Sequence, residues 1–132
     1  QQQRGVVMAE VQKLLRTEDV ASSQIVLIGP AAWGKGSLAG ASVIAGAPLT
    51  ESVEEWRAGD GLLVTTARAF KGLEADVVVL YDVRGFSKWF LKMDLYVACT
   101  RAKHLLVTIS TEGEVRRTLE RCELVARSQE AT

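Results

Sequence analysis

Four short apolar runs constrain the fold of this chain more than any other feature of its sequence. They are rich in valine, leucine and isoleucine, and they comprise Gln24–Ile28, Leu62–Thr66, Asp76–Tyr81 and Leu105–Ile109. Near-continuous apolar runs of this length are typical of strands buried on both faces. Segments with helical spacing separate them, and this alternation predicts a mainly parallel sheet covered by helices on both faces. The predicted fold class is therefore α/β.

The segments between the runs supply the predicted helices and turns. Apolar residues recur at helical spacing in Arg4–Arg16 and Phe86–Ala102, and a closing helix is predicted over Glu112–Arg127. Ser37–Ala45 is predicted as a helix of small residues. Thr50 is predicted to cap another helix that extends to Arg57, and Ala67–Leu73 is predicted as a short helical or turn segment.

Length, charge and cysteine usage narrow the class of protein. The 132 residues are 48% apolar, which suits one domain spanning residues 1–132. The 16 basic and 16 acidic residues balance, whereas proteins that bind nucleic acid through a basic surface are usually more positive. Any DNA contact is therefore expected to be local.

Cys99 and Cys122 lie far apart without metal-ligand spacing, so we expect free thiols, a cytoplasmic protein and no metal site. Every apolar run is far shorter than the ~20 residues of a membrane span, and no membrane partner is predicted. The chain opens on Gln1 without a signal peptide, and we expect it to be a fragment of a longer protein.

The first polar motif follows the second apolar run. Lys71-Gly72-Leu73-Glu74 comes soon after Thr66, and loops at the carboxyl ends of parallel strands are common ligand sites. Gly72 would let a ligand approach the backbone closely, and Lys71 and Thr66 suit phosphate oxygens. The Glu74 carboxylate suits a sugar hydroxyl. An ordinary turn with a solvated Lys/Glu pair explains these residues equally well.

The second polar motif places Thr100-Arg101 between a predicted helix and the last apolar run. An arginine there can reach a neighbouring domain. Arginines supplied across an interface stabilise a transferring phosphoryl group and accelerate the reaction by about 10³ to 10⁵. The guanidinium suits this role because it is always charged and presents a planar fork of donors. The alternative is that Arg101 and Lys103 only favour the C-terminus of the helix through its dipole.

In this order, the motifs at residues 65–76 and 94–103 resemble the fifth and sixth motifs of superfamily 1 DNA helicases of the Rep/UvrD type. The resemblance spans Leu62–Ile109 and implies the second, C-terminal RecA-like domain of such an enzyme, with a three-layer fold. A weaker resemblance upstream, at Ile25–Ile28, Pro30 and Ser37–Gly40, is to compact helicases fused to nuclease-related domains.

The resemblance implies a motor domain of an ATP-dependent DNA helicase. Arg101 would be the catalytic finger on the γ-phosphate, Glu74 would contact the ribose, and Thr66 and Arg68 would face phosphates of single-stranded DNA. The remaining ATP-binding positions would be Gly72, Lys71 and Thr100. The cofactors would be ATP and Mg²⁺, with the metal held by an N-terminal RecA-like partner domain, so the isolated chain is predicted to be inactive.

The chain departs from the family pattern in several places. Arg68 stands where the family commonly has histidine, which changes the expected DNA geometry, and Phe70 replaces a smaller residue and is predicted to be core. The stretch from Ile28 to Leu62 leaves no room for the subdomain that many members insert there, which implies a compact form. The family's Asn-Tyr-Arg-Ser element should precede the first helix and is not in the chain, which suggests a truncation.

Two alternative functions come from other classes. Residues Gly29–Ser37 have the spacing of a Walker A phosphate loop, with Lys35 in the phosphate-binding position and an ending like that of adenylate kinase. Asp82, after an apolar run, would then suit magnesium. The bulk of Trp33 favours an ordinary turn instead. The other alternative is a non-catalytic helicase-like module that docks a partner.

Overall fold

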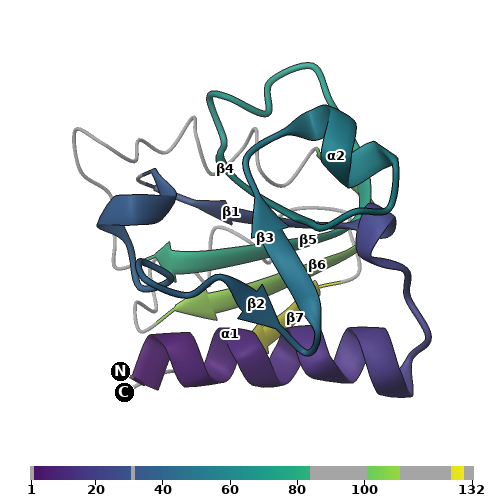
Figure 1. Ribbon diagram of the computed structural model, residues 1–132. Coiled ribbons are helices and arrows are strands. Elements are labelled where there is room, and N and C mark those ends of the chain that lie inside the picture. Colours follow the sequence, from purple (N-terminus) through teal and green to yellow (C-terminus); the bar gives the residue numbers. More distant parts are fainter. Residues whose placement is uncertain (1, 31, 84–100, 111–125, 130–132) are drawn as a thin grey trace.

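The computed structural model describes residues 2–30, 32–83, 101–110 and 126–129 (Figure 1). Within these ranges seven strands form one sheet in the order β2-β3-β4-β1-β5-β6-β7. Their bounds are β1 Ile25–Gly29, β2 Val43–Ile44, β3 Ala47–Thr50, β4 Leu62–Thr66, β5 Ala75–Val83, β6 Ala102–Ser110 and β7 Ala126–Gln129. All neighbouring pairs are parallel except β2 and β3, which are antiparallel. The predicted mainly parallel α/β sheet is confirmed.

The described helices lie on opposite faces of this sheet. Helix α1 spans Gln2–Gln12 and continues as a π-helical segment, η1, over Lys13–Thr17. Helix α2 spans Val53–Arg57, and single 3-10 turns occur at Ser22–Gln24 (η2) and Trp33–Lys35 (η3). Figure 1 shows α1 along one face of the sheet and α2 on the other side. No described helix is long and apolar enough to cross a membrane.

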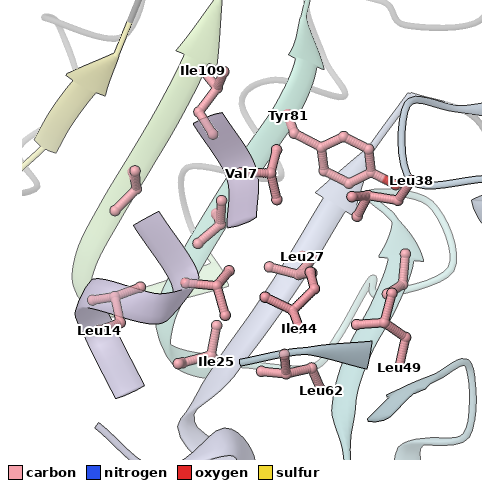
Figure 2. Close-up of a cluster of buried hydrophobic side chains, with 14 of the residues drawn as sticks. Val7, Leu14, Ile25, Leu27, Leu38, Ile44, Leu49, Leu62, Tyr81 and Ile109 are labelled. Atoms are coloured by element: carbon pink, nitrogen blue, oxygen red, sulfur yellow. The ribbon is translucent and has the colours of Figure 1, made fainter. Parts of the chain in front are cut away.

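Alternate residues of each central strand enter two separate cores, because successive side chains of a strand point to opposite faces. On β1, Ile25 and Leu27 pack with Val7 and other residues of α1, in the cluster that Figure 2 shows. Val26 and Ile28 pack on the α2 side. All residues of β1 are buried, and this explains why their run is apolar without alternation.

Trp56 attaches α2 to the sheet. Its indole Nε1 donates to the carbonyl oxygens of Ile25, at 2.8 Å, and Ser22, at 3.0 Å. Its ring meets Phe70 edge-on, with centroids 5.9 Å apart. Since the indole N–H is satisfied, the large ring is buried without a polar penalty.

The start of α2 differs from the prediction. Ser52 is the capping residue, and its hydroxyl accepts from the backbone N–H of Glu55 at 3.2 Å. Thr50 instead ends β3, where it pairs with Leu63 of β4, and its hydroxyl donates to the Glu55 carboxylate at 2.6 Å. The ladder with β4 holds Thr50 in extended conformation, so the helix begins later. Its predicted end at Arg57 is confirmed.

The predicted helix over Ser37–Ala45 is wrong. A turn at residues 37–40 ends on Gly40, whose φ of 83° is incompatible with a continuing right-handed helix. The chain then forms a tight hairpin in which Ile44 of β2 pairs with Ala47 of β3. The hairpin's two turn residues, Ala45 and Gly46, have φ of 52° and 86°. Positive φ at both central residues is the signature of a type I′ turn.

The C-terminal predictions are partly outside the described residues. The predicted helix Glu112–Arg127 is wrong at its end, because Ala126 and Arg127 belong to β7 and pair with Leu106 and Val107 of β6. Residues 112–125 of that prediction, and residues 86–100 of the preceding one, lie outside the described part. Ala102, predicted to be helical, begins β6 and pairs with Ala75. Pairing with a neighbouring strand outweighs the local pattern at both places.

Replacing Ala45 by glycine should stabilise the chain by about 1 kcal/mol, because an L-residue with a side chain is strained at positive φ and glycine is not. Urea unfolding of Ala45→Gly measures this free energy. The matched control is Ala58→Gly, since Ala58 has φ of −75° at the end of α2 and should lose stability. Equal destabilisation by both substitutions would contradict the type I′ turn.

Candidate functional site

The first polar motif has residues at both ends of the sheet, and Arg101 of the second motif lies at one of these ends. Because β1, β4, β5 and β6 are parallel, their first residues share one edge, the amino edge, and their last residues share the other, the carboxyl edge. Thr66 ends β4 at the carboxyl edge, whereas Glu74 directly precedes β5 and Arg101 directly precedes β6. The expectation that Glu74 lies at the carboxyl ends of the strands is therefore wrong. A parallel strand needs a crossover, so the segment after β4 must return along the sheet before β5 begins.

The crossover at residues 67–73 lies on the α2 face. Phe70 is 1% exposed within the α2-side core, which confirms the prediction that it is a core residue. The first turn is tied to the end of β4, since Thr66 accepts from Phe70 N at its carbonyl, at 3.0 Å, and from Ala69 N at its hydroxyl, at 3.2 Å. Arg68 and Lys71 are exposed along this segment.

Gly72 has φ of 85° in the same crossover. No described atom lies within 4 Å of the place where its Cβ would stand. The left-handed conformation therefore favours glycine at this position, although there is space for a side chain.

Glu74 and Arg101 both lie at the amino edge. Each precedes one residue of the register pair Ala75 and Ala102, on adjacent parallel strands. The Arg101 guanidinium donates through Nη1 to the carbonyl of Leu73 at 3.4 Å. Glu74 is exposed and Arg101 is half-buried. The structure thus brings the predicted ribose-binding and phosphate-binding side chains to one edge; Thr100 lies outside the described residues.

Sequence reasoning missed a second polar group at this edge, centred on Asp76. Its Oδ2 accepts from the Gln24 amide at 2.8 Å, and its Oδ1 lies 3.7 Å from the Nε2 atom of His104. Gln24 directly precedes β1, and Asp76 and His104 belong to β5 and β6. No sequence signal indicates this group, because only the strand order brings the three residues together.

At the carboxyl edge, the Walker-like loop is bound to the rest of the chain. Ser37 donates its backbone N–H to Asp82 Oδ2 at 2.7 Å and its hydroxyl to Asp82 Oδ1. Asp82 lies in β5 two residues beyond Leu80, the last residue that pairs with β1. It has φ of 58°, which aspartate tolerates better than most residues. Arg4 of α1 donates to the carbonyl oxygens of Ser37, at 2.9 Å, and Ala39.

These contacts do not favour a phosphate loop. The N–H groups of Lys35 and Gly36 donate to the carbonyls of Ala32 and Trp33, so they are directed within the loop. The segment after the loop is a turn, whereas phosphate loops lead into a helix whose N-terminus faces the anion. Among the described residues, no three side chains of the metal-ligating types lie together. The interpretation of residues 29–37 as a turn is supported.

Tyr81 fills the space beneath this loop. The side chain is fully buried, in the same cluster as Leu38 (Figure 2), and a Cβ on Gly29 would lie 2.7 Å from its Cζ atom. Its hydroxyl has no hydrogen-bond partner among the described residues. Burial raises the pKa of Tyr81, and the carboxylates of Asp82 and Glu51 raise it further.

Tyr81→Phe should raise the free energy of unfolding by about 1 kcal/mol, because it removes an unsatisfied buried hydroxyl. The pKa of this phenol is higher in the folded than in the unfolded chain, so the unfolded chain ionises first as the pH rises. The titration of this group therefore leaves the free energy of unfolding unaffected below about pH 10 and lowers it above that pH. The wild-type chain should therefore lose more stability than Tyr81→Phe between pH 9 and about pH 11. Urea unfolding at both pH values measures the difference, and lower stability of the variant at pH 9 would reveal a partner for the hydroxyl.

Comparison with known proteins identifies the segment that carries these motifs. Residues 61–109 match the family model of the UvrD-like helicase C-terminal domain. No curated protein and no solved structure matches the chain. The matched range runs from the residue before β4 into β6 and includes Thr66, Glu74 and Arg101. Residues 61–109 are therefore similar to the UvrD-like helicase C-terminal domain, and they lie in a mainly parallel α/β sheet that is consistent with a RecA-like fold.

Proposed function

We propose that this chain, over residues 1–132, is the C-terminal motor domain of an ATP-dependent DNA helicase or translocase. The observation that carries the proposal is the family match over both motifs, together with the position of Glu74 and Arg101 at the same edge of the sheet. Such a domain contributes half of an ATP site. The N-terminal RecA-like domain of the same protein would contribute the phosphate loop and hold the Mg²⁺ ion.

In this proposal the amino edge faces the nucleotide. The contact of Arg101 with the Leu73 carbonyl is long for a hydrogen bond, at 3.4 Å. A charge-assisted bond to the γ-phosphate would be stronger and would replace it readily. The exposed Glu74 carboxylate can accept from a ribose hydroxyl, and Lys71, Gly72 and Thr100 complete the ATP-binding set. The isolated chain would then bind nucleotide weakly and hydrolyse none.

Single-stranded DNA would lie toward the carboxyl edge, on Thr66 and Arg68. Arg68 is exposed in the first turn after β4, where a guanidinium can reach a phosphate. Nucleotide and DNA would thus occupy opposite ends of the same sheet. Closure of the two RecA-like domains on ATP moves the sheet as one body, so both ends shift together. Opening after hydrolysis would complete one step along the strand.

In a protein that joins this chain to its N-terminal RecA-like domain, Arg101→Ala should lower DNA-stimulated ATP hydrolysis by about 10³-fold or more. Nucleotide affinity should change little, because the finger acts mainly on charge that develops during phosphoryl transfer. Steady-state ATPase assays and equilibrium binding of a fluorescent ATP analogue measure the two effects. Arg57→Ala is the control, since Arg57 is exposed on α2. An unchanged turnover rate in Arg101→Ala would exclude the finger role.

Lys35→Ala should leave the ATPase of the same joined protein unchanged, because Lys35 is exposed in a loop whose N–H groups are bound within the chain. The isolated chain should show no ATPase or phosphoryl transfer. Activity of the isolated chain that disappears in Lys35→Ala would instead establish a phosphotransferase. A joined protein without any ATPase would favour a non-catalytic docking module.

A further inference from the structure

The start of β6, directly after Arg101, is irregular. On β5, one residue, Asp76, separates the paired residues Ala75 and Val77; on β6, two residues, Lys103 and His104, separate their partners Ala102 and Leu105. The extra residue interrupts the ladder at this point. Bulges of this kind occur often beside active sites, where they redirect a nearby side chain.

Asp76 lies opposite this bulge and connects three elements. Its Oδ2 accepts from the Gln24 amide at 2.8 Å, which ties it to the start of β1. Its Oδ1 lies 3.7 Å from the Nε2 atom of His104, which ties it to the bulged part of β6. The Asp76 side chain is 29% exposed, whereas that of His104 is 75% exposed. The carboxylate is thus the more enclosed, fixed member of the contact.

We propose that Asp76 is a positioning residue for Arg101: with Gln24 and His104 it holds the bulge at the start of β6 and so sets the direction in which the guanidinium leaves the sheet. The inference rests on the proposed finger role of Arg101. Two anchors then flank the arginine. The first is the Leu73 carbonyl, which accepts from the Arg101 guanidinium. The second is Asp76, which contacts His104, three residues after Arg101.

The charges at this edge suit such a role. The basic residues Arg101 and Lys103 lie at the start of β6, and the acidic residues Glu74 and Asp76 lie at the start of the adjacent β5. The carboxylate of Asp76 therefore attracts the segment that carries the arginine. Because His104 is largely exposed, the contact adds little to folding stability. A displacement of about 1 Å at a catalytic group can nevertheless reduce a rate by about 10²-fold. The effect is therefore expected in catalysis and not in unfolding.

The test uses the protein that joins this chain to its N-terminal RecA-like domain. Asp76→Asn preserves the size of the side chain and an amide acceptor for Gln24 but removes the charge that faces His104. It should lower kcat of the DNA-stimulated ATPase by about 10- to 100-fold, with KM for ATP changed less than about twofold. His104→Gln should act in the same direction. Asp60→Asn is the matched control, because Asp60 is an exposed carboxylate in the turn before β4.

The double variant distinguishes positioning from a general structural role. If Asp76 acts only through Arg101, Asp76→Asn should not lower kcat further when Arg101 is already alanine. A further loss there, or an unchanged kcat in Asp76→Asn alone, would overturn the proposal. If Asp76→Asn does not fold, as judged by thermal melting, His104→Gln decides in the same way. Full activity of Arg101→Ala would remove the finger and this inference together, whereas loss in Arg101→Ala with full activity in Asp76→Asn would remove only this inference.

Discussion

The parallel pairing of β1 with both β4 and β5 is the constraint on which the rest of the structure depends. It places β1 in the middle of the sheet, where its alternate side chains enter the two cores, one packed against α1 and the other against α2. It also compels the chain to cross from the end of β4 back to the start of β5. That crossover separates Thr66 from Glu74 along the length of the sheet. The separation of the proposed DNA-facing end from the proposed nucleotide-facing end is thus a consequence of strand direction.

The same pairing explains why the Walker-like loop, residues 29–37, is bound to the rest of the chain. The ends of β1 and β5 are adjacent, so Asp82 lies beside the loop that follows β1 and accepts two hydrogen bonds from Ser37. Tyr81, one residue earlier, points to the α1 face and fills the space beneath Gly29. The carboxyl edge at β1, a common ligand site in open α/β sheets, is therefore occupied by the chain's own side chains. This agrees with the proposal that an N-terminal RecA-like domain supplies the phosphate loop.

The predictable part of the fold follows from continuous apolar runs. Four strands, the helix before β1 and the core position of Phe70 were accessible because local apolar patterns indicate them. The hairpin at Ala45 and Gly46 was not, since small residues suit a helix or a turn equally well and the positive φ of Gly40 decides between them. The cap at Ser52 and the strand β7 were missed because pairing with β4 and β6 is non-local.

The sequence by itself determined the α/β class, the two motifs and the identity of the side chains that we propose for phosphate, ribose and DNA. These depend on residue type and spacing within short segments. Tertiary structure decided where those side chains lie: Glu74 and Arg101 together at the amino edge, and Asp76 with Gln24 and His104 beside them. Gln24 and Asp76 are 52 positions apart in the chain, and only the order of strands in the sheet makes them neighbours. Strand order depends on which buried faces pack together, which no local pattern records.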